Sequence, residues 1–289
     1  MSVGSGVVRW SALAGAMFVS AAAPAQTPTF SASVENVRVD VLVTDGDEPL
    51  LGLGAHDFEV LDNGVVQKVD LATFETLPLN VVLALDTSGS VTGARLASLR
   101  DASRAIVGGL LAGDQAGLLT FSSTLSVRTD LTGDTDRLNT ALEGAPVSGD
   151  TSLVDAIYAA IVTAESGAGR GLVIVLSDGA DTASFLRPES VHETARRSDV
   201  VVYGVSVSRL ARKSFVNDLC AATGGRVLQA GSTDRVRETF LRVLQEFRHR
   251  YVLSYVPEGV PRDGWHRLKV RVKSRRASVK ARPGYLAGP

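Results

Sequence analysis

The sequence has little cysteine, little net charge and no long apolar run. Cys220 is the single cysteine among 289 residues, so no disulfide can form within the chain. It lies in an apolar helical pattern without a neighbouring histidine, which predicts a small buried side chain rather than a reactive thiol. The net charge of -1 argues against a dedicated nucleic-acid binder, because such proteins need clustered positive charge.

The first 25 residues differ in composition from the rest of the chain. Arg9 is their only charged residue, and an alanine-rich apolar run extends from Trp10 to Ala22. That run is too short to span a bilayer, and Ala23-Pro24-Ala25 provides the small residues that signal peptidase accepts. We therefore expect residues 1–25 to be a secretory signal removed before Gln26, the alternative being a buried N-terminal helix. The mature chain is expected in the periplasm or the medium, without a transmembrane segment.

The two flanks of the chain carry strand patterns. Within residues 34–75, Asn63-Gly64 separates two short strand patterns and predicts a hairpin in which Glu59 faces Lys68. In the C-terminal flank, Trp265–Lys273 alternates apolar residues with Arg and Lys, which we interpret as a solvated edge strand rather than an anion-binding surface. Neither flank has enough strands to cover its own apolar face, so we expect both to pair into one antiparallel β module.

The centre of the chain alternates apolar strands with amphipathic helices. Strands are expected at Asn80–Leu85, Gly117–Phe121, Leu172–Leu176 and Val200–Val207. Such alternation implies parallel pairing with helices on both faces, so the predicted fold is α/β, a doubly wound, mostly parallel, Rossmann-like sheet with a small β module. The expected divisions are a signal peptide (1–25), an N-terminal β segment (26–78), an α/β domain (79–248) and a C-terminal β segment (249–289).

Oxygen-bearing side chains follow the predicted strands at the edge where open α/β sheets bind ligands. The candidate metal ligands are Asp86, Ser88, Ser90, Thr151 and Asp178. We expect Gly89 to allow the sharp turn within the first group. Carboxylates and hydroxyls without His or Cys favour a hard divalent cation, Mg²⁺ or Mn²⁺.

A structural interpretation of the same residues is also open. Asp-x-Ser-x-Ser often caps a helix, because these side chains accept bonds from the free N–H groups of the first turn. The additional Thr151 and Asp178 favour the metal site over this alternative. Asp181 is interpreted as a turn or cap residue.

The three-part pattern resembles the metal-ion-dependent adhesion site of von Willebrand factor A domains, over about residues 79–245. The resemblance implies that Ser88 and Ser90 bind the metal directly and that Thr151 is a direct or switching ligand. It implies that Asp86 and Asp178 bind directly or through water, and that a Glu or Asp of a protein partner completes the metal shell.

The flanking motifs narrow this resemblance and also show departures from it. Asp62-Asn63-Gly64 ahead of the site and Gly284-Tyr285 behind it are similar to exported VWFA-related proteins typical of acidobacteria. Val91 stands where Met is common, and Asp150 replaces a common Gly before Thr151. Asp150 adds negative charge, which would strengthen cation binding and weaken the attraction for a partner's carboxylate.

These observations favour a binding protein over an enzyme. The expected partner is an extracytoplasmic protein that presents Glu or Asp, and the alternative is a structural component of the cell envelope stiffened by its metal. A Mg²⁺-dependent phosphohydrolase of the haloacid dehalogenase type is disfavoured, because it needs a second Asp where Ser88 stands. The serine-hydrolase motif G-x-S-x-G does not occur, and the four histidines lie outside the loops that contain the candidate metal ligands. No catalytic residues are therefore expected.

Overall fold

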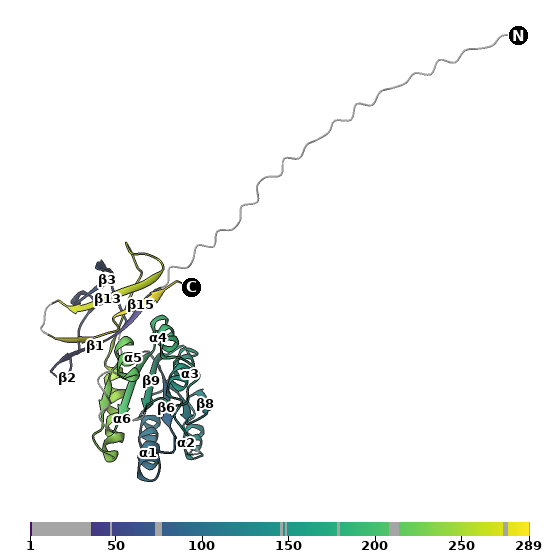
Figure 1. Cartoon of the computed structure of the whole chain (residues 1–289). Coiled ribbons are helices and arrows are strands. Elements are labelled where there is room, and N and C mark those ends of the chain that lie inside the picture. Colours follow the sequence, from purple (N-terminus) through teal and green to yellow (C-terminus); the bar gives the residue numbers. More distant parts are fainter. Residues whose placement is uncertain are drawn as a thin grey trace. The chain divides into compact units, whose positions relative to one another are not determined.

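The chain divides into two units at Ser33, and all of the structure described below except Met1 lies in the second, Val34–Pro289. The structure is a computed structural model, and it describes residues 1, 36–46, 48–72, 77–144, 147, 149–177, 180–207, 214–273 and 277–288 (Figure 1). The predicted signal peptide lies outside the described residues except for Met1. Within the described ranges, no helix combines the length and apolar character needed to cross a membrane.

The centre of the chain forms a six-stranded sheet (Figure 1). Its order is β11 (Val227–Gln229), β10 (Val201–Ser206), β9 (Arg170–Leu176), β6 (Leu79–Asp86), β7 (Gln115–Phe121) and β8 (Leu125–Thr132). Neighbouring strands are parallel except β7 and β8. The chain passes from β6 to β7 on one side and later to β9 on the other, so the strand order reverses at β6. Such a reversal marks the usual ligand-binding edge of the sheet.

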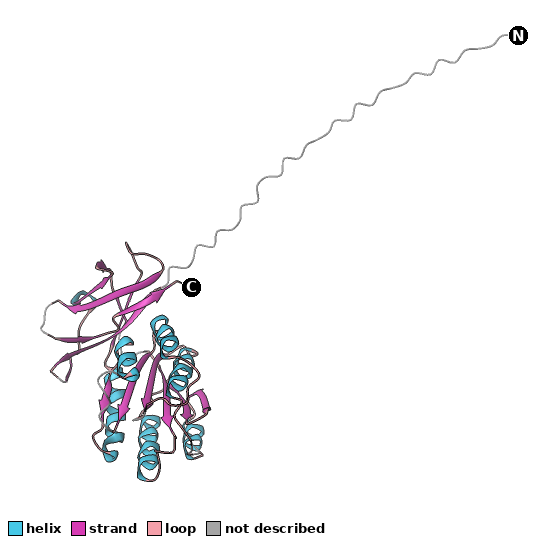
Figure 2. Cartoon of the chain, viewed as in Figure 1, coloured by secondary structure: helices cyan, strands magenta, loops and turns pink. Residues whose placement is uncertain are grey.

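Helices cover both faces of this sheet (Figure 2). One face packs against α1 (Ala94–Gly108), α2 (Thr135–Glu143) and α6 (Val236–Arg248). The other packs against α3 (Leu153–Glu165), α4 (Pro188–Arg197) and α5 (Phe215–Ala222). Alternate residues of β6 enter the two cores, which is why this strand is a continuous buried run. The predicted doubly wound, mostly parallel sheet is confirmed.

The two flanks together form a β sandwich of two antiparallel sheets. One sheet has the order β14 (Ser278–Lys280), β1 (Val37–Asp45), β12 (Tyr251–Tyr255) and β5 (Asp70–Ala72), with β2 (Glu48–Pro49) on β1. The other has the order β15 (Gly284–Ala287), β13 (Gly264–Val272), β3 (Phe58–Asp62) and β4 (Val65–Gln67). One apolar cluster joins them, with Val39 and Leu253 from the first sheet and Phe58 and Val60 from the second. The expected pairing of both flanks is therefore confirmed.

The predicted hairpin forms with one change of partner. Asn63 and Gly64 both have positive φ, 47° and 87°, as the two-residue turn requires. The register is the predicted one, but β4 ends at Gln67, so Lys68 lies beyond the ladder. Glu59 instead forms an ion pair of 3.4 Å with Arg271, which lies directly opposite on β13. The expected pairing of Glu59 with Lys68 is wrong.

The basic strand β13 is an interior strand of its sheet. It pairs with β15 on one side and with β3 on the other, so its interpretation as an edge strand is wrong. Its alternation is as predicted, because Leu268 is buried while Arg267 and Lys269 are exposed. The positively charged side chains lie on the solvent-exposed face of this interior strand.

Buried arginines connect the sandwich to the α/β domain. Arg170, at the start of β9, forms an ion pair with Asp40 of β1. Arg282, between β14 and β15, donates to the carbonyl oxygen of Ser198 at 2.9 Å. Arg250, between α6 and β12, is completely buried. Buried guanidinium groups need such partners, so these contacts fix the two substructures to each other.

Candidate metal centre

Asp86 is the last residue of β6 and is 1% exposed. Its carboxylate accepts hydrogen bonds from the backbone N–H of Ser88 at 2.9 Å and from the hydroxyl of Ser177 at 3.0 Å. No ion pair among the described residues involves Asp86. A buried carboxylate held by neutral donors is a group that a cation would stabilise.

Ser88 and Ser90 place two hydroxyl oxygens in the loop that directly follows this carboxylate. The two oxygens lie 3.2 Å apart; Ser88 is buried and Ser90 is exposed. Neighbouring oxygens in an octahedral Mg²⁺ shell lie roughly 3 Å apart, because each is about 2.1 Å from the metal. The donor set therefore fits a small hard cation.

The turn after β6 does not require the expected glycine, and the positive φ of this segment occurs instead at Gly93. Gly93 has φ of 54°, whereas a Cβ on Gly89 would make only an ordinary contact, 3.5 Å from the carbonyl oxygen of Gly149. Gly93 is also the N-cap of α1, and no side chain caps this helix. The expectation for Gly89 and the helix-cap interpretation of Asp86-x-Ser-x-Ser are both wrong.

The loop that contains Thr151 lies against the loop after β6. The N–H of Gly89 donates to the carbonyl oxygen of Gly149 at 3.0 Å, and Thr151 is buried two residues later. Gly149 has φ of 75°, and a Cβ there would lie 2.2 Å from the hydroxyl of Ser123. Asp150 is exposed, and its N–H donates to that same hydroxyl at 2.7 Å. The structure thus brings this loop to the edge occupied by Asp86.

Asp178, the fifth candidate ligand, lies outside the described residues. Its described neighbour Ser177 donates to Asp86, so the carboxyl end of β9 lies beside the carboxylate. The four described candidates come from the predicted loops, and their role as metal ligands stays a prediction.

The segment after the β9 loop is bonded to the start of α3. The N–H groups of Thr182 and Ala183 donate to the carbonyl oxygen of Thr151 at 2.9 and 3.1 Å. Asp181 accepts from the N–H of Val154 at 3.2 Å, in the first turn of α3. The interpretation of Asp181 as a cap residue is confirmed.

Sequence reasoning missed several residues that hold these loops. The carbonyl oxygen of Ser122 accepts from both the N–H and the hydroxyl of Ser152, at 2.8 and 2.7 Å. Ser122 and Ser123 directly follow β7, and Ser177 directly follows β9. The rule that predicted the metal ligands, hydroxyls at the carboxyl ends of strands, could have found these serines as well.

The site contains no catalytic arrangement of histidines. His56 lies in η1 (Ala55–Asp57), His192 on α4, His249 just after α6 and His266 on β13. In the described part of the chain, no three His, Cys, Asp or Glu side chains gather as a metal cluster. A cation at this edge would therefore depend on hydroxyl ligands.

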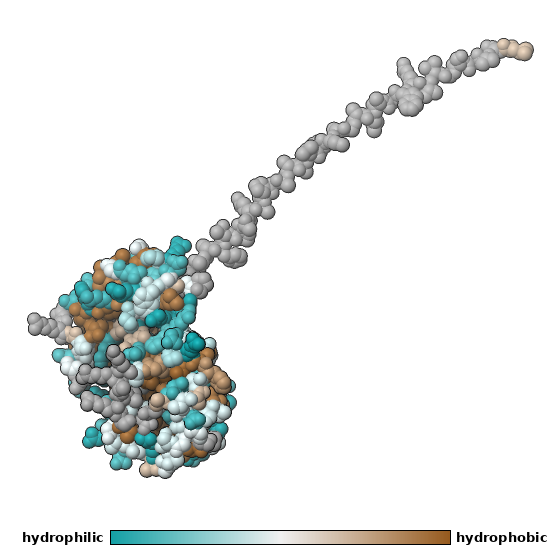
Figure 3. Space-filling view, in the orientation of Figure 1, coloured by the Kyte–Doolittle hydropathy of each residue, from teal (hydrophilic) through white to brown (hydrophobic). Residues whose placement is uncertain are grey.

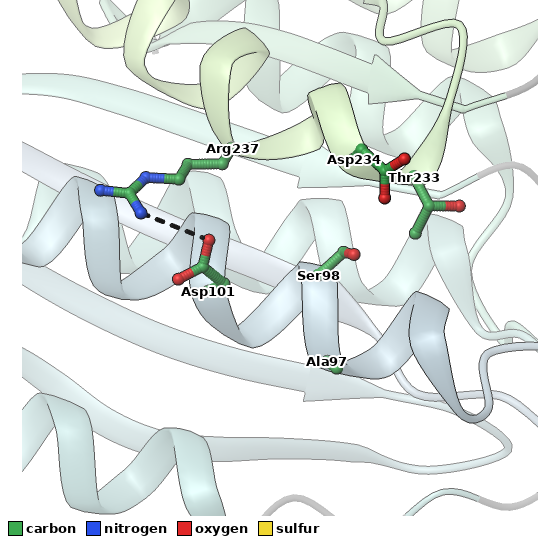
Figure 4. A pocket seen from close by; sticks show the side chains of 6 residues that line it. All are labelled: Ala97, Ser98, Asp101, Thr233, Asp234 and Arg237. Atoms are coloured by element: carbon green, nitrogen blue, oxygen red, sulfur yellow. Dashed lines mark ion pairs between the residues drawn. The ribbon is translucent and has the colours of Figure 1, made fainter.

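A shallow depression lies elsewhere, between α1 and α6 (Figure 4). Its volume is about 340 Å³. It is lined by Ala97, Ser98, Asp101, Thr233, Asp234 and Arg237. Asp101 and Arg237 face each other across it at 3.6 Å. None of the candidate metal ligands lines it, so it is separate from the metal site.

Comparison with known sequences identifies one family. The profile of the von Willebrand factor type A domain matches residues 80–242. The inter-alpha-trypsin inhibitor heavy chain H4 of Bos taurus is 28% identical over 176 residues, which are 56% of this chain and 18% of that protein. The same protein of Sus scrofa is 26% identical over 136 residues, 43% of this chain and 15% of that protein. The chain thus matches less than a fifth of the length of these relatives.

Solved structures with a similar fold include two extracytoplasmic proteins. The PilB minor pilin from Streptococcus sanguinis has a TM-score of 0.51 and 13% identity, over 60% of this chain and 62% of that chain. Proximal thread matrix protein 1 from the mussel byssus has a TM-score of 0.54 and 16% identity, over 64% of this chain and 49% of that chain. A second structure of the mussel protein has a zinc-occupied MIDAS motif.

Proposed function

Because the chain belongs to the von Willebrand factor type A domain family, we propose that it is an exported protein-binding module that depends on a divalent cation. Domains of this family commonly bind a divalent metal, and they and the inter-alpha-trypsin inhibitor heavy chains are mostly non-catalytic binding modules. The fold shared with a minor pilin and a byssus protein is compatible with adhesion outside the cytoplasm.

One observation carries the metal part of the proposal. The hydroxyls of Ser88 and Ser90 lie 3.2 Å apart in the loop that follows Asp86, a buried carboxylate without an ion-pair partner in the described structure. We assign Ser88 and Ser90 as direct ligands of Mg²⁺ or Mn²⁺, with Thr151 as a further hydroxyl ligand. Asp86 and Asp178 would bind directly or through water. The bound cation would supply an attraction for an external carboxylate.

The neutral hydroxyl ligands are the reason to expect an acidic partner. Hydroxyls do not cancel the charge of a divalent cation, so a Glu or Asp from an extracytoplasmic protein can complete its shell. The exposed Asp150, next to Thr151, repels such a group. We therefore expect modest affinity for the partner.

Isothermal titration calorimetry tests the metal assignment. Mg²⁺ and Mn²⁺ should bind the wild-type mature protein, and Zn²⁺ should bind no more tightly, because oxygen ligands favour harder cations. Ser88→Ala should abolish Mg²⁺ binding, whereas the matched control Ser98→Ala on α1 should not change it. The zinc in the mussel protein makes Zn²⁺ the cation to compare. Much tighter binding of Zn²⁺ than of Mg²⁺, together with normal Mg²⁺ binding by Ser88→Ala, would contradict the assignment.

Thermal unfolding supplies a second readout of the same site. A ligand that binds only the folded state stabilises it by about 2.7 kcal/mol at a hundredfold excess over its dissociation constant. The melting temperature should therefore rise with Mg²⁺ and fall back with chelator in the wild type, and should not respond in Asp86→Ala. An equal melting temperature of the wild type with Mg²⁺ and with chelator would contradict the binding of a metal to the folded protein.

A pull-down from envelope extract with and without chelator tests partner binding. Capture should need Mg²⁺, vanish with Asp86→Ala and weaken with Thr151→Ala while circular dichroism shows an intact fold. Substituting the Glu and Asp residues of the captured protein should then identify one acidic residue that binding requires. Metal-dependent stability without any metal-dependent partner would favour the structural alternative.

Export remains part of the proposal. Amino-terminal sequencing of the secreted or periplasmic protein should give Gln26 as the first residue. A protein that retains Met1 in the cytoplasm would contradict export. The resemblance to acidobacterial proteins stays a prediction.

A further inference from the structure

A large aromatic side chain is exposed to solvent in the segment that follows the β9 loop of the candidate metal site. Phe185 is 95% exposed, although phenylalanine is a residue that folding ordinarily buries. Leu186, the next residue, is also exposed. Both lie in the segment between β9 and α4.

The backbone under these two side chains is held in place. The carboxylate of Asp155 on α3 accepts from the N–H groups of Phe185 and Leu186 at 2.9 and 2.8 Å. The hydroxyl of Ser184 accepts from the N–H groups of Val154 and Asp155 at 3.0 and 3.1 Å. The exposed ring of Phe185 therefore belongs to a loop whose backbone is held by hydrogen bonds to α3.

The fixed loop is joined to a candidate metal ligand. The N–H of Thr151 donates to the hydroxyl of Thr182 at 3.0 Å. Phe185 follows Thr182 by three residues, which can span at most about 11 Å. A peptide whose carboxylate reaches the metal can therefore place a residue only a few positions away against the ring.

Further apolar side chains continue from this loop along α3. Tyr158 and Val162 are exposed, Val162 by 47%. They follow Asp155 by three and seven residues, so all three lie on one face of the helix. Figure 3 shows hydrophobic surface over the region where α3 lies in Figure 1. We call Phe185, Leu186, Tyr158 and Val162 the α3 strip.

We propose that the α3 strip binds the apolar side chains that neighbour the partner's metal-binding acidic residue. This inference rests on the proposed function, and it names the partner's chemistry: a protein segment in which a Glu or Asp stands within about three residues of large apolar side chains. Burial of the exposed ring removes apolar surface from water, so the strip adds affinity and sequence preference to the charge interaction at the metal.

Selection from a phage library of random dodecapeptides tests this inference. The immobilised mature protein is loaded with Mg²⁺, and bound phage are eluted with chelator. Wild-type protein should enrich peptides with an acidic residue and, within three positions, a large apolar residue. Phe185→Ser should still enrich acidic peptides but lose the apolar preference, and should bind the best wild-type peptide about tenfold more weakly. Its Mg²⁺ affinity by calorimetry should equal that of the wild type.

Matched controls separate the possible failures. Leu111→Ser, which removes a side chain that is 61% exposed at the opposite edge of the sheet, should behave as the wild type. Identical peptides from Phe185→Ser and wild type would overturn the role of the α3 strip alone. No chelator-eluted peptides, or equal selection by Asp86→Ala, would overturn the proposed function with it. Wild-type dimers on gel filtration that Phe185→Ser abolishes would assign the strip to self-association instead.

Discussion

Glu246, on α6, shows how a buried acid is kept ionised in this protein. Its carboxylate accepts from the hydroxyl of Tyr203 at 2.8 Å and from Nε of Arg226 at 3.1 and 3.2 Å. Burial opposes ionisation, but the hydrogen bonds from Arg226 and Tyr203 outweigh it, so the pKa of Glu246 is lowered. Burial also raises the pKa of Tyr203, which therefore remains a donor.

Glu246→Gln should destabilise the protein in a pH-dependent way. A carboxyl group with a lowered pKa in the folded state contributes stability above its unfolded pKa of about 4.3, and loses it as pH falls through the folded pKa. We expect Glu246→Gln to cost about 2 kcal/mol at pH 7, because a hydrogen-bonded charge is lost, and the cost should shrink below pH 4. Urea unfolding at pH 7, 5, 4 and 3 measures this difference. The exposed Glu238→Gln on the same helix is the control, and a cost that is constant with pH would refute the prediction.

Cys220 illustrates what one residue's sequence context can predict. It is completely buried on α5, as the apolar pattern around it indicates, and burial raises the pKa of its thiol to about 12. His266 is the opposite case. It is buried and bonded to Asp62 at 2.8 Å, and nothing in its local sequence predicts this, because the two residues are 204 apart.

At the scale of elements, the loop before α3 depends on Gly149. We expect Gly149→Ala to cost about 1–3 kcal/mol, because it combines a positive φ with a Cβ against Ser123. Mg²⁺ binding should weaken as well, since Thr151 lies two residues further on. Gly89→Ala should have a much smaller effect on thermal unfolding without metal, because Gly89 has neither a positive φ nor a short contact for an added Cβ. Equal losses from the two variants would contradict this account of the turn.

Sequence patterns predicted the central strands because these are buried on both faces. β6, β7, β9 and β10 are apolar runs whose boundaries lie within two residues of the expected ones. β8 and α2 were not predicted. β8 is an edge strand with one buried residue among its eight, and a register irregularity interrupts its pairing with β7, so neither a continuous nor an alternating pattern appears.

The loops of the candidate site could be predicted, whereas the contacts that hold them to one another could not. Asp86 and Ser88 stand at a strand end in the sequence itself. Ser177 also stands at a strand end, but its bond to Asp86 spans 91 positions, and the bonds of Ser184 to Val154 and Asp155 span 30 and 29 positions. Such contacts leave no local pattern. The need for glycine at position 89 was wrongly expected for a related reason, since the positive φ lies at Gly93 and depends on where α1 begins.

At the scale of the whole molecule, Arg250 connects the sandwich and the α/β domain. Its guanidinium group donates to the carbonyl oxygen of Gly224 at 2.6 Å, to the hydroxyl of Tyr203 at 2.8 Å and to the carbonyl oxygen of Asp40 at 3.4 Å. Asp40 belongs to the sandwich, and the other two acceptors belong to the α/β domain. One buried side chain thus links both substructures.

Arg250→Met should separate the unfolding of the two substructures. Removing the guanidinium group leaves buried acceptors unpaired, so we expect a loss of about 3 kcal/mol. Trp265, on β13, is the only tryptophan after the predicted signal, and Arg196 of α4 lies over its ring, so fluorescence follows the sandwich and its contact with α4. Far-ultraviolet circular dichroism follows mainly the helices. The two urea transitions should coincide in the wild type and in Arg267→Met, and separate in Arg250→Met. Separate transitions in the wild type would contradict the coupling.

The pairing of β1 has a consequence for how the chain is made. Val41 pairs with Tyr251, and Val43 pairs with Val279, so β1 meets its long partners β12 and β14 only when almost all of the described chain exists, and before that it can pair only with the two-residue β2. At a synthesis rate of about 5–20 residues per second, that interval lasts roughly 10–40 s. During it, the α/β domain can complete its own sheet, while the apolar face of β1 stays uncovered and available to chaperones or to other chains. The C-terminal strands β12 and β14 therefore decide when β1 stops being an aggregation hazard.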